Sequence, residues 1–103
     1  MGGQYFGSQK EAARWLDLQR LQDCGDVRNL KAHPVYPLWV LAPNGEVITV
    51  GKYTADSSYE LKDLVGRWVP IVEDVKAPPS RTEAYQLRKR MAEALYGIRV
   101  TEV

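Results

Sequence analysis

Three side chains at the end of one predicted strand have the types and spacing for metal-dependent chemistry on phosphodiesters. Residues 70–85 read PIVEDVKAPPSRTEAY, so Glu73, Asp74 and Lys76 follow strand-forming residues and precede a proline-rich elbow. Because residues two apart in a strand share a face, we expect Asp74 and Lys76 to project together and Glu73 to face away into solvent. Carboxylates are ligands for Mg²⁺, and lysine can neutralise charge that develops on a phosphate. The alternative interpretation is a strand end that runs out into water.

One carboxylate is not enough to hold a metal ion, and the preceding predicted strand supplies a second in Asp56, within YTADSSYE. If the two strands form an antiparallel pair with a turn at residues 61–67, the simplest register places Asp56 opposite residues 66–72, with Asp74 further along. Sequence does not determine register to a single residue. The acid-x-Lys triplet is also short, and it occurs again at residues 60–62. The triplet therefore becomes informative only through its position in the whole chain.

The first predicted element is a helix. Ser8 and Glu11 have the spacing of a capping box, and the apolar pattern that follows predicts a helix over residues 9–24. Gly25 is the expected stop signal. The capping box explains Glu11 completely without any catalytic role. We interpret residues 26–34 as a connection.

Strands occupy the middle of the chain. Two β-rich runs flank a Pro-Asn-Gly-Glu turn, and the second extends from residue 46 to about residue 59, with Gly51 as a candidate bulge. The third strand is predicted over residues 68–76. A short alternating strand over residues 98–103 closes the chain.

A second helix lies between the third strand and the last one. Ser80 and Glu83 repeat the capping-box spacing, and Gly97 ends the helical pattern. A helical crossover usually joins parallel strands, so the last strand is expected to lie parallel to another strand. The residues predicted to form the buried stripe of this helix are Ala84, Leu87, Met91, Ala94 and Leu95.

The predicted order is therefore helix, three strands, helix, strand. This order indicates an α/β (α+β) fold in which a mixed central sheet is flanked by two helices. A chain of 103 residues has room for a single domain, residues 1–103, with one modest core.

Composition restricts the class of protein. Hydrophobic residues make up 45% of the chain and charged residues 26%, which is typical of a globular protein. No apolar run approaches the roughly 20 residues of a membrane span, and the start shows no secretory signal. The single cysteine excludes an internal disulfide framework and suits a reducing cytosol. The net charge of +1 does not by itself indicate a nucleic-acid-binding protein.

The order of motifs resembles the core of the PD-(D/E)xK nuclease superfamily, in which an acid on the second strand precedes acid-x-Lys on the third. More closely, the chain is similar to a small phage and prophage family catalogued as a domain of unknown function within that superfamily. The stretches that carry the resemblance cover most of the chain: FGSQKEAARWLDLQRLQDCGDVRNL, YTADSSYE, VEDVKAPPSRTEAYQLRKRM and GIRVTEV.

The resemblance implies an endonuclease that uses Mg²⁺, with Mn²⁺ as a substitute, and acts on branched or recombination-intermediate DNA in the cytoplasm of a bacterial host. By position, it assigns metal binding to Asp56, Asp74 and the helix acid Glu11. It assigns the (D/E)xK lysine to Lys76.

Basic and aromatic residues beside the predicted site are candidates for contacts with the phosphate backbone, because the second helix leaves directly from that site. These candidates are Arg14, Arg81, Tyr85, Arg88 and Lys89. Specific DNA interfaces bury about 1,000–2,500 Å², which is large for a domain of this size, so a homodimer is expected.

A second hypothesis remains open. The same fold could belong to a catalytically silent phage protein that binds nucleic acid or a host protein as an inhibitor or regulator. Ser57, which stands where the resemblance leads us to expect an aromatic residue, and the near-neutral charge favour this reading.

Overall fold

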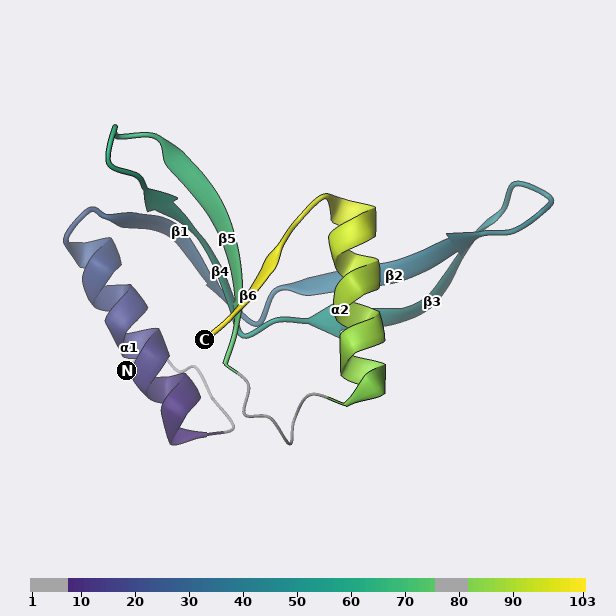
Figure 1. Cartoon of the computed structure of the whole chain (residues 1–103), viewed down its shortest axis with the longest axis horizontal. Helices are drawn as coiled ribbons and strands as arrows, with labels where there is room; N and C mark the ends of the chain where they lie inside the picture. Colours follow the sequence, from purple (N-terminus) through teal and green to yellow (C-terminus); the bar gives the residue numbers. More distant parts are fainter. Residues whose placement is uncertain (1–7, 76–81) are drawn as a thin grey trace.

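The computed structural model describes residues 8–75 and 82–103. Within them the chain forms two helices and six strands (Figure 1). In chain order these are α1 (Gln9–Asp23), β1 (Val27–Ala32), β2 (Val35–Leu41), β3 (Val47–Thr54), β4 (Ser57–Lys62), β5 (Trp68–Asp74), α2 (Glu83–Tyr96) and β6 (Val100–Glu102). No helix in these two ranges is long and apolar enough to cross a membrane.

The strands form two sheets. A four-stranded sheet has the order β1-β4-β5-β6, and β6 lies parallel to β5, which confirms the parallel placement of the last strand. The fold is therefore α+β with a mixed sheet and two helices, as predicted. Strands β2 and β3 form a separate hairpin; α2 lies beside the base of this hairpin, and the far end of the hairpin extends away from the rest of the protein (Figure 1). This hairpin explains a radius of gyration of 15.3 Å, compared with about 13 Å for a compact domain of 100 residues.

The prediction of a connection over residues 26–34 is wrong, because most of this segment is strand β1. The strand pairs with β4, but its register shifts between Arg28 and Lys31. Asn29, inside the irregularity, has a φ of 56°. An irregular pairing of this kind breaks the alternation of buried and exposed residues that identifies a strand in a sequence.

The long second run, predicted as one strand over residues 46–59, is two strands in two different sheets. It divides at Ala55 and Asp56, between β3 and β4. The bulge predicted at Gly51 is confirmed, because Leu38 pairs with Gly51 whereas Trp39 pairs with Thr49. Strands β3 and β4 are thus each shorter than the β-rich run over residues 46–59.

Helix α1 begins and ends where the sequence predicts. The Ser8 side chain accepts a hydrogen bond from the backbone N–H of Glu11 at 3.1 Å, and Cys24 caps the other end. Its buried residue, Leu18, packs with Val27 of β1 and Tyr59 of β4 in a small core on one face of the four-stranded sheet. Helix α1 is thereby held against this sheet.

Helix α2 packs at a second core, formed mainly by Leu38, Tyr53, Val72, Ala92 and Val100. Thr82 caps the helix by accepting a hydrogen bond from the N–H of Tyr85, whereas the predicted cap Ser80 lies outside the described residues. Gly97 ends the helix with a left-handed φ of 63°, as expected.

The predicted buried stripe of α2 is only partly correct. Met91 and Leu95 pack against the core, but Leu87 is 61% exposed. The residue of α2 that is completely buried is Ala92, next to the predicted stripe.

Candidate metal centre

Three potential metal ligands from separate segments meet where strand β1 ends beside the start of strand β4. Glu11 lies in the first turn of α1, His33 between β1 and β2, and Asp56 between β3 and β4. Each residue offers one ligand atom, and these atoms lie within 4.8 Å of one another. Among the described residues, this is the group of three that the geometry allows to share one ion.

Backbone hydrogen bonds hold two of these residues together. The N–H of His33 donates to the carbonyl of Asp56 at 2.9 Å, and the N–H of Asp56 donates to the carbonyl of Glu73 at 3.1 Å. These contacts continue the β1–β4 and β4–β5 ladders by one residue beyond the strands, because Ala32 pairs with Ser57 and Ser57 pairs with Glu73. The predicted register, with Asp56 opposite residues 66–72, is therefore wrong: Asp56 lies level with residues 73 and 74.

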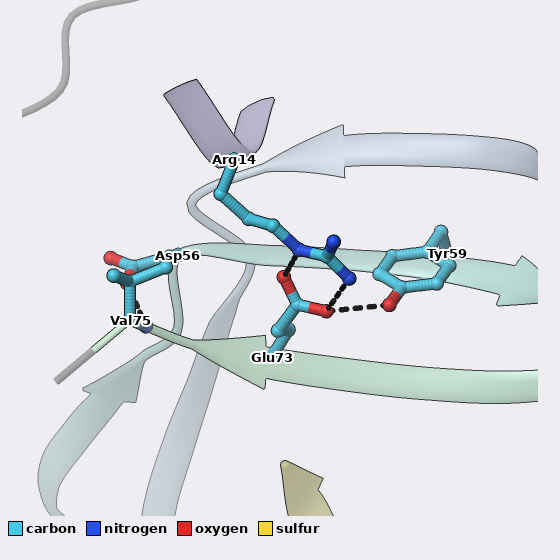
Figure 2. A network of polar contacts seen from close by, with 5 residues as sticks. All are labelled: Arg14, Asp56, Tyr59, Glu73 and Val75. Atoms are coloured by element: carbon cyan, nitrogen blue, oxygen red, sulfur yellow. Dashed lines mark hydrogen bonds and ion pairs between the residues drawn. The ribbon is translucent and has the colours of Figure 1, made fainter. Parts of the chain in front are cut away.

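The side chain of Asp56 is also anchored. Its Oδ2 accepts a hydrogen bond from the N–H of Val75 at 2.6 Å (Figure 2 shows the two residues together). The carboxylate is therefore held in one orientation before any ligand binds, which lowers the entropy cost of binding an ion.

His33 has an unusual backbone. Its φ of 51° lies in the left-handed region, which costs a residue other than glycine on the order of 1 kcal/mol or more. No sequence motif predicts chemistry at this histidine, yet the structure places a ring nitrogen of His33 within 4.8 Å of carboxylate oxygens of Glu11 and Asp56.

The three groups suit a divalent cation. Ligand oxygens and nitrogens lie about 2.1 Å from ions such as Mg²⁺ or Zn²⁺, so two ligands of one ion are at most about 4.2 Å apart. A separation of up to 4.8 Å needs only a small closing movement of half-buried side chains. Carboxylates suit Mg²⁺ and Mn²⁺, whereas imidazole suits transition metals.

Asp74, predicted as the partner of Asp56, does not belong to this group. It is fully buried, and its Oδ2 accepts hydrogen bonds from the hydroxyls of Tyr53 and Tyr85, while its Oδ1 accepts one from the N–H of Asp56 at 3.0 Å. Metal binding by Asp74 stays a prediction. Lys76 lies outside the described residues.

Glu73 is buried rather than solvated, so that expectation is wrong. Only 1% of its side chain is exposed, and Arg14 of α1 donates to both carboxylate oxygens, at 2.7 and 3.0 Å (Figure 2). Tyr59 donates a third hydrogen bond at 2.5 Å. The strand alternation was predicted correctly, since Glu73 does face away from Asp74, but α1 covers that face.

Three of the residues predicted to contact nucleic acid contact carboxylates of the protein itself. The guanidinium of Arg14 is bound to Glu73, which raises its pKa further above the ordinary value. Tyr85 contacts Asp74 and Glu102, and Lys89 lies 3.7 Å from Glu102. Arg81 lies outside the described residues.

Tyrosine hydroxyls donate hydrogen bonds to the two buried acids, Glu73 and Asp74. The environment of these tyrosines predicts that the stability of the fold depends on pH. Burial and the carboxylate of Glu73 raise the pKa of Tyr59 to about 12. Burial also raises the pKa values of Tyr36, Tyr53 and Tyr85, the last two with contributions from Asp74.

We therefore expect the protein to lose stability in alkaline solution. A tyrosine whose pKa is raised on folding contributes stability that is fully present below the unfolded value of about 10 and is lost as the pH rises through its folded value. The tyrosinate absorbance that belongs to Tyr36, taken as the difference between the wild type and Tyr36→Phe, should appear only as the protein unfolds above that pH. Tyr36→Phe, which removes one of these groups, should make the decline shallower. Difference absorbance from Tyr36 that appears while the protein is still folded would contradict this account.

Comparison of this chain with known protein families, with curated proteins and with solved structures finds no match.

Proposed function

We propose that this protein is a metal-dependent phosphodiesterase that cuts DNA, with Glu11, His33 and Asp56 as the ligands of the ion. The observation that carries the proposal is the approach of these three side chains, from three separate segments, to within 4.8 Å. Two of them, Glu11 and Asp56, are also positions that the resemblance to nucleases assigns to metal binding.

Each ligand has a definite role in this proposal. A bound divalent cation would activate water and stabilise charge on the phosphate. Glu11 and Asp56 would hold it through carboxylate oxygens, and His33 through a ring nitrogen. Without a cation the two carboxylates would repel a phosphate, so the same ligands make binding of the reacting phosphate at this centre depend on the metal. Their half-buried positions leave the centre accessible from solvent.

The wider setting is also a proposal. The substrate is DNA, including branched or recombination-intermediate forms, and the place of action is the cytoplasm of a bacterial host. A homodimer would present two such centres to one substrate. Mg²⁺ is the expected ion, and the imidazole ligand makes Mn²⁺ at least as effective.

A catalytically silent binding protein is the second candidate. It is favoured by the position of Asp74, which is engaged by Tyr53 and Tyr85 rather than grouped with Asp56. A protein of this kind would bind nucleic acid or a host protein without cutting it.

One cleavage experiment separates the two candidates. The protein is incubated with supercoiled plasmid and with a four-way DNA junction, in Mg²⁺, in Mn²⁺ or in EDTA. We expect nicking in both metals and none in EDTA. Binding of either substrate without cleavage in any metal would support the silent protein instead, and cleavage that persists in EDTA would exclude a metal-dependent mechanism.

A further inference from the structure

A hollow with two basic side chains lies on the other side of Asp74 from the candidate metal centre. Its volume is about 540 Å³, and it opens between strand β3 and the first half of helix α2. The residues that matter for its chemistry are Lys52, Tyr53 and Thr54 of β3 together with Thr82, Tyr85 and Arg88 at or near the start of α2.

The two basic residues come from different elements and face the same hollow. Lys52 and Arg88 are both exposed. Within the described residues, neither forms an ion pair with an acidic side chain, in contrast to Arg14, Arg28 and Lys89. Two such cations beside one cavity repel each other, and an anion between them would offset that repulsion through two attractions.

The hydroxyl groups of the hollow divide into two kinds. Tyr53 and Tyr85 donate their protons inward to the buried Asp74. Thr82 accepts from the backbone N–H of Tyr85, which leaves its own hydroxyl proton available for another acceptor. Thr82 therefore adds a neutral donor to the two cationic ones.

The acidic groups behind the hollow are covered. Asp74 is fully buried beneath the two tyrosines. Glu102 accepts from the hydroxyl of Tyr85 at 3.0 Å and lies 3.7 Å from the ammonium group of Lys89. The groups that remain to meet a ligand in the hollow are thus mainly donors, and two of them are charged.

We propose that this hollow binds a backbone phosphate of a polynucleotide, with Lys52, Thr82 and Arg88 as its donors. Arginine and lysine are the usual partners of phosphate oxygens in nucleic-acid complexes. The inference rests on the proposed function and deepens it, because Asp74 connects the two sites: it accepts from Tyr53 and Tyr85 on the hollow's side and from the N–H of Asp56 on the metal side. The hollow would hold the strand while the metal centre acts on a phosphate nearby.

The test measures binding without catalysis. Fluorescence anisotropy of a labelled oligonucleotide duplex is recorded in EDTA, with the wild type, with Lys52→Ala/Arg88→Ala and with the matched control Lys31→Ala/Arg90→Ala. Both variants lose two positive charges from exposed positions, so their long-range electrostatics change equally. Circular dichroism and a thermal melt establish that each variant is folded.

We expect the hollow variant to bind at least about 10-fold more weakly and to lose about one unit of the salt-dependence slope, because one phosphate is no longer neutralised. The control should stay within about 3-fold of the wild type. An equal loss in both variants, or no duplex binding by the wild type, would overturn the proposal. A third outcome would also overturn it. If inorganic phosphate binds at Arg88 but does not displace the duplex, the hollow binds a small anion rather than a polynucleotide.

The outcome is independent of the cleavage experiment. Weak binding by the hollow variant in EDTA supports a phosphate site even if the wild type cuts no DNA in any metal. Conversely, metal-dependent cutting with unchanged binding by the hollow variant would keep the proposed function and remove this site.

Discussion

Replacing Asp56 by asparagine is expected to weaken Mn²⁺ binding by at least about 100-fold, because loss of a hydrogen-bond partner behind a ligand already costs about 10–100-fold and here a ligand charge is removed. The substitution is nearly isosteric. An asparagine oxygen can still accept from the N–H of Val75, which Asp56 now does at 2.6 Å, so the fold should persist. The measurement is isothermal titration calorimetry of the purified protein with Mn²⁺, and cleavage of plasmid should fall in parallel.

The matched control is Asp17→Asn on α1. Asp17 is an exposed acid whose interaction is an ion pair with Arg20 at 3.5 Å, and it lies outside the candidate centre. Its replacement should leave Mn²⁺ affinity unchanged. If the Asp56 variant bound Mn²⁺ as tightly as the wild type, Asp56 would not be a ligand and the proposed metal centre would have to be abandoned.

Replacing Arg14 by leucine should destabilise the fold by about 3–5 kcal/mol, in the range measured when one partner of a buried ion pair is removed. The reason lies with Glu73, of which 1% is exposed. Without Arg14, a buried carboxylate would retain only the hydrogen bond from Tyr59. Urea unfolding followed by circular dichroism gives the difference in free energy. The side chain of Arg14 is 34% exposed, so the lower end of the range is the better estimate.

Two further variants identify the cause of this loss. Arg20→Leu makes the same chemical change on the same helix, but its pair with Asp17 is exposed, so the cost should stay within about 0.5 kcal/mol. Arg14→Leu/Glu73→Leu removes both charges and should recover part of the stability, because no ion is left without a partner. Equal effects of Arg14→Leu and Arg20→Leu would show that Glu73 is not buried in solution.

Features that depend on a few neighbouring residues could be predicted from the sequence. The cap at Ser8, the helix end at Gly97 and the bulge at Gly51 all follow from local backbone requirements of these residue types, and the structure has each of them. The parallel placement of the last strand follows from the crossover helix, which is a rule of chain connection rather than of composition.

Features that depend on packing between elements far apart in the sequence could not be predicted in this way. Glu73 alternates correctly with Asp74, but only the position of α1 makes its face buried. Strand β1 was missed because its irregular pairing near Asn29 disrupts the period-two pattern.

The role proposed for His33 was missed for a different reason, because its partners are distant in the sequence. Its neighbours in the metal centre are 22 residues before it, at Glu11, and 23 residues after it, at Asp56. No local spacing connects them. The pairing of β1 with β4 brings His33 to Asp56, and the packing of α1 brings Glu11 to both.

The position of the hairpin's two attachment points has a mechanical consequence. The chain leaves the four-stranded sheet at His33 and Pro34 and returns at Ala55 and Asp56, and these passages are bonded to each other, with Ala55 donating to Pro34 at 3.1 Å. An ion bound by both His33 and Asp56 would therefore fix the two chain segments that connect the β2–β3 hairpin to the four-stranded sheet. Metal binding would then restrict movement of the hairpin relative to the sheet. The angle at which the hairpin meets a large substrate would depend on whether metal is bound.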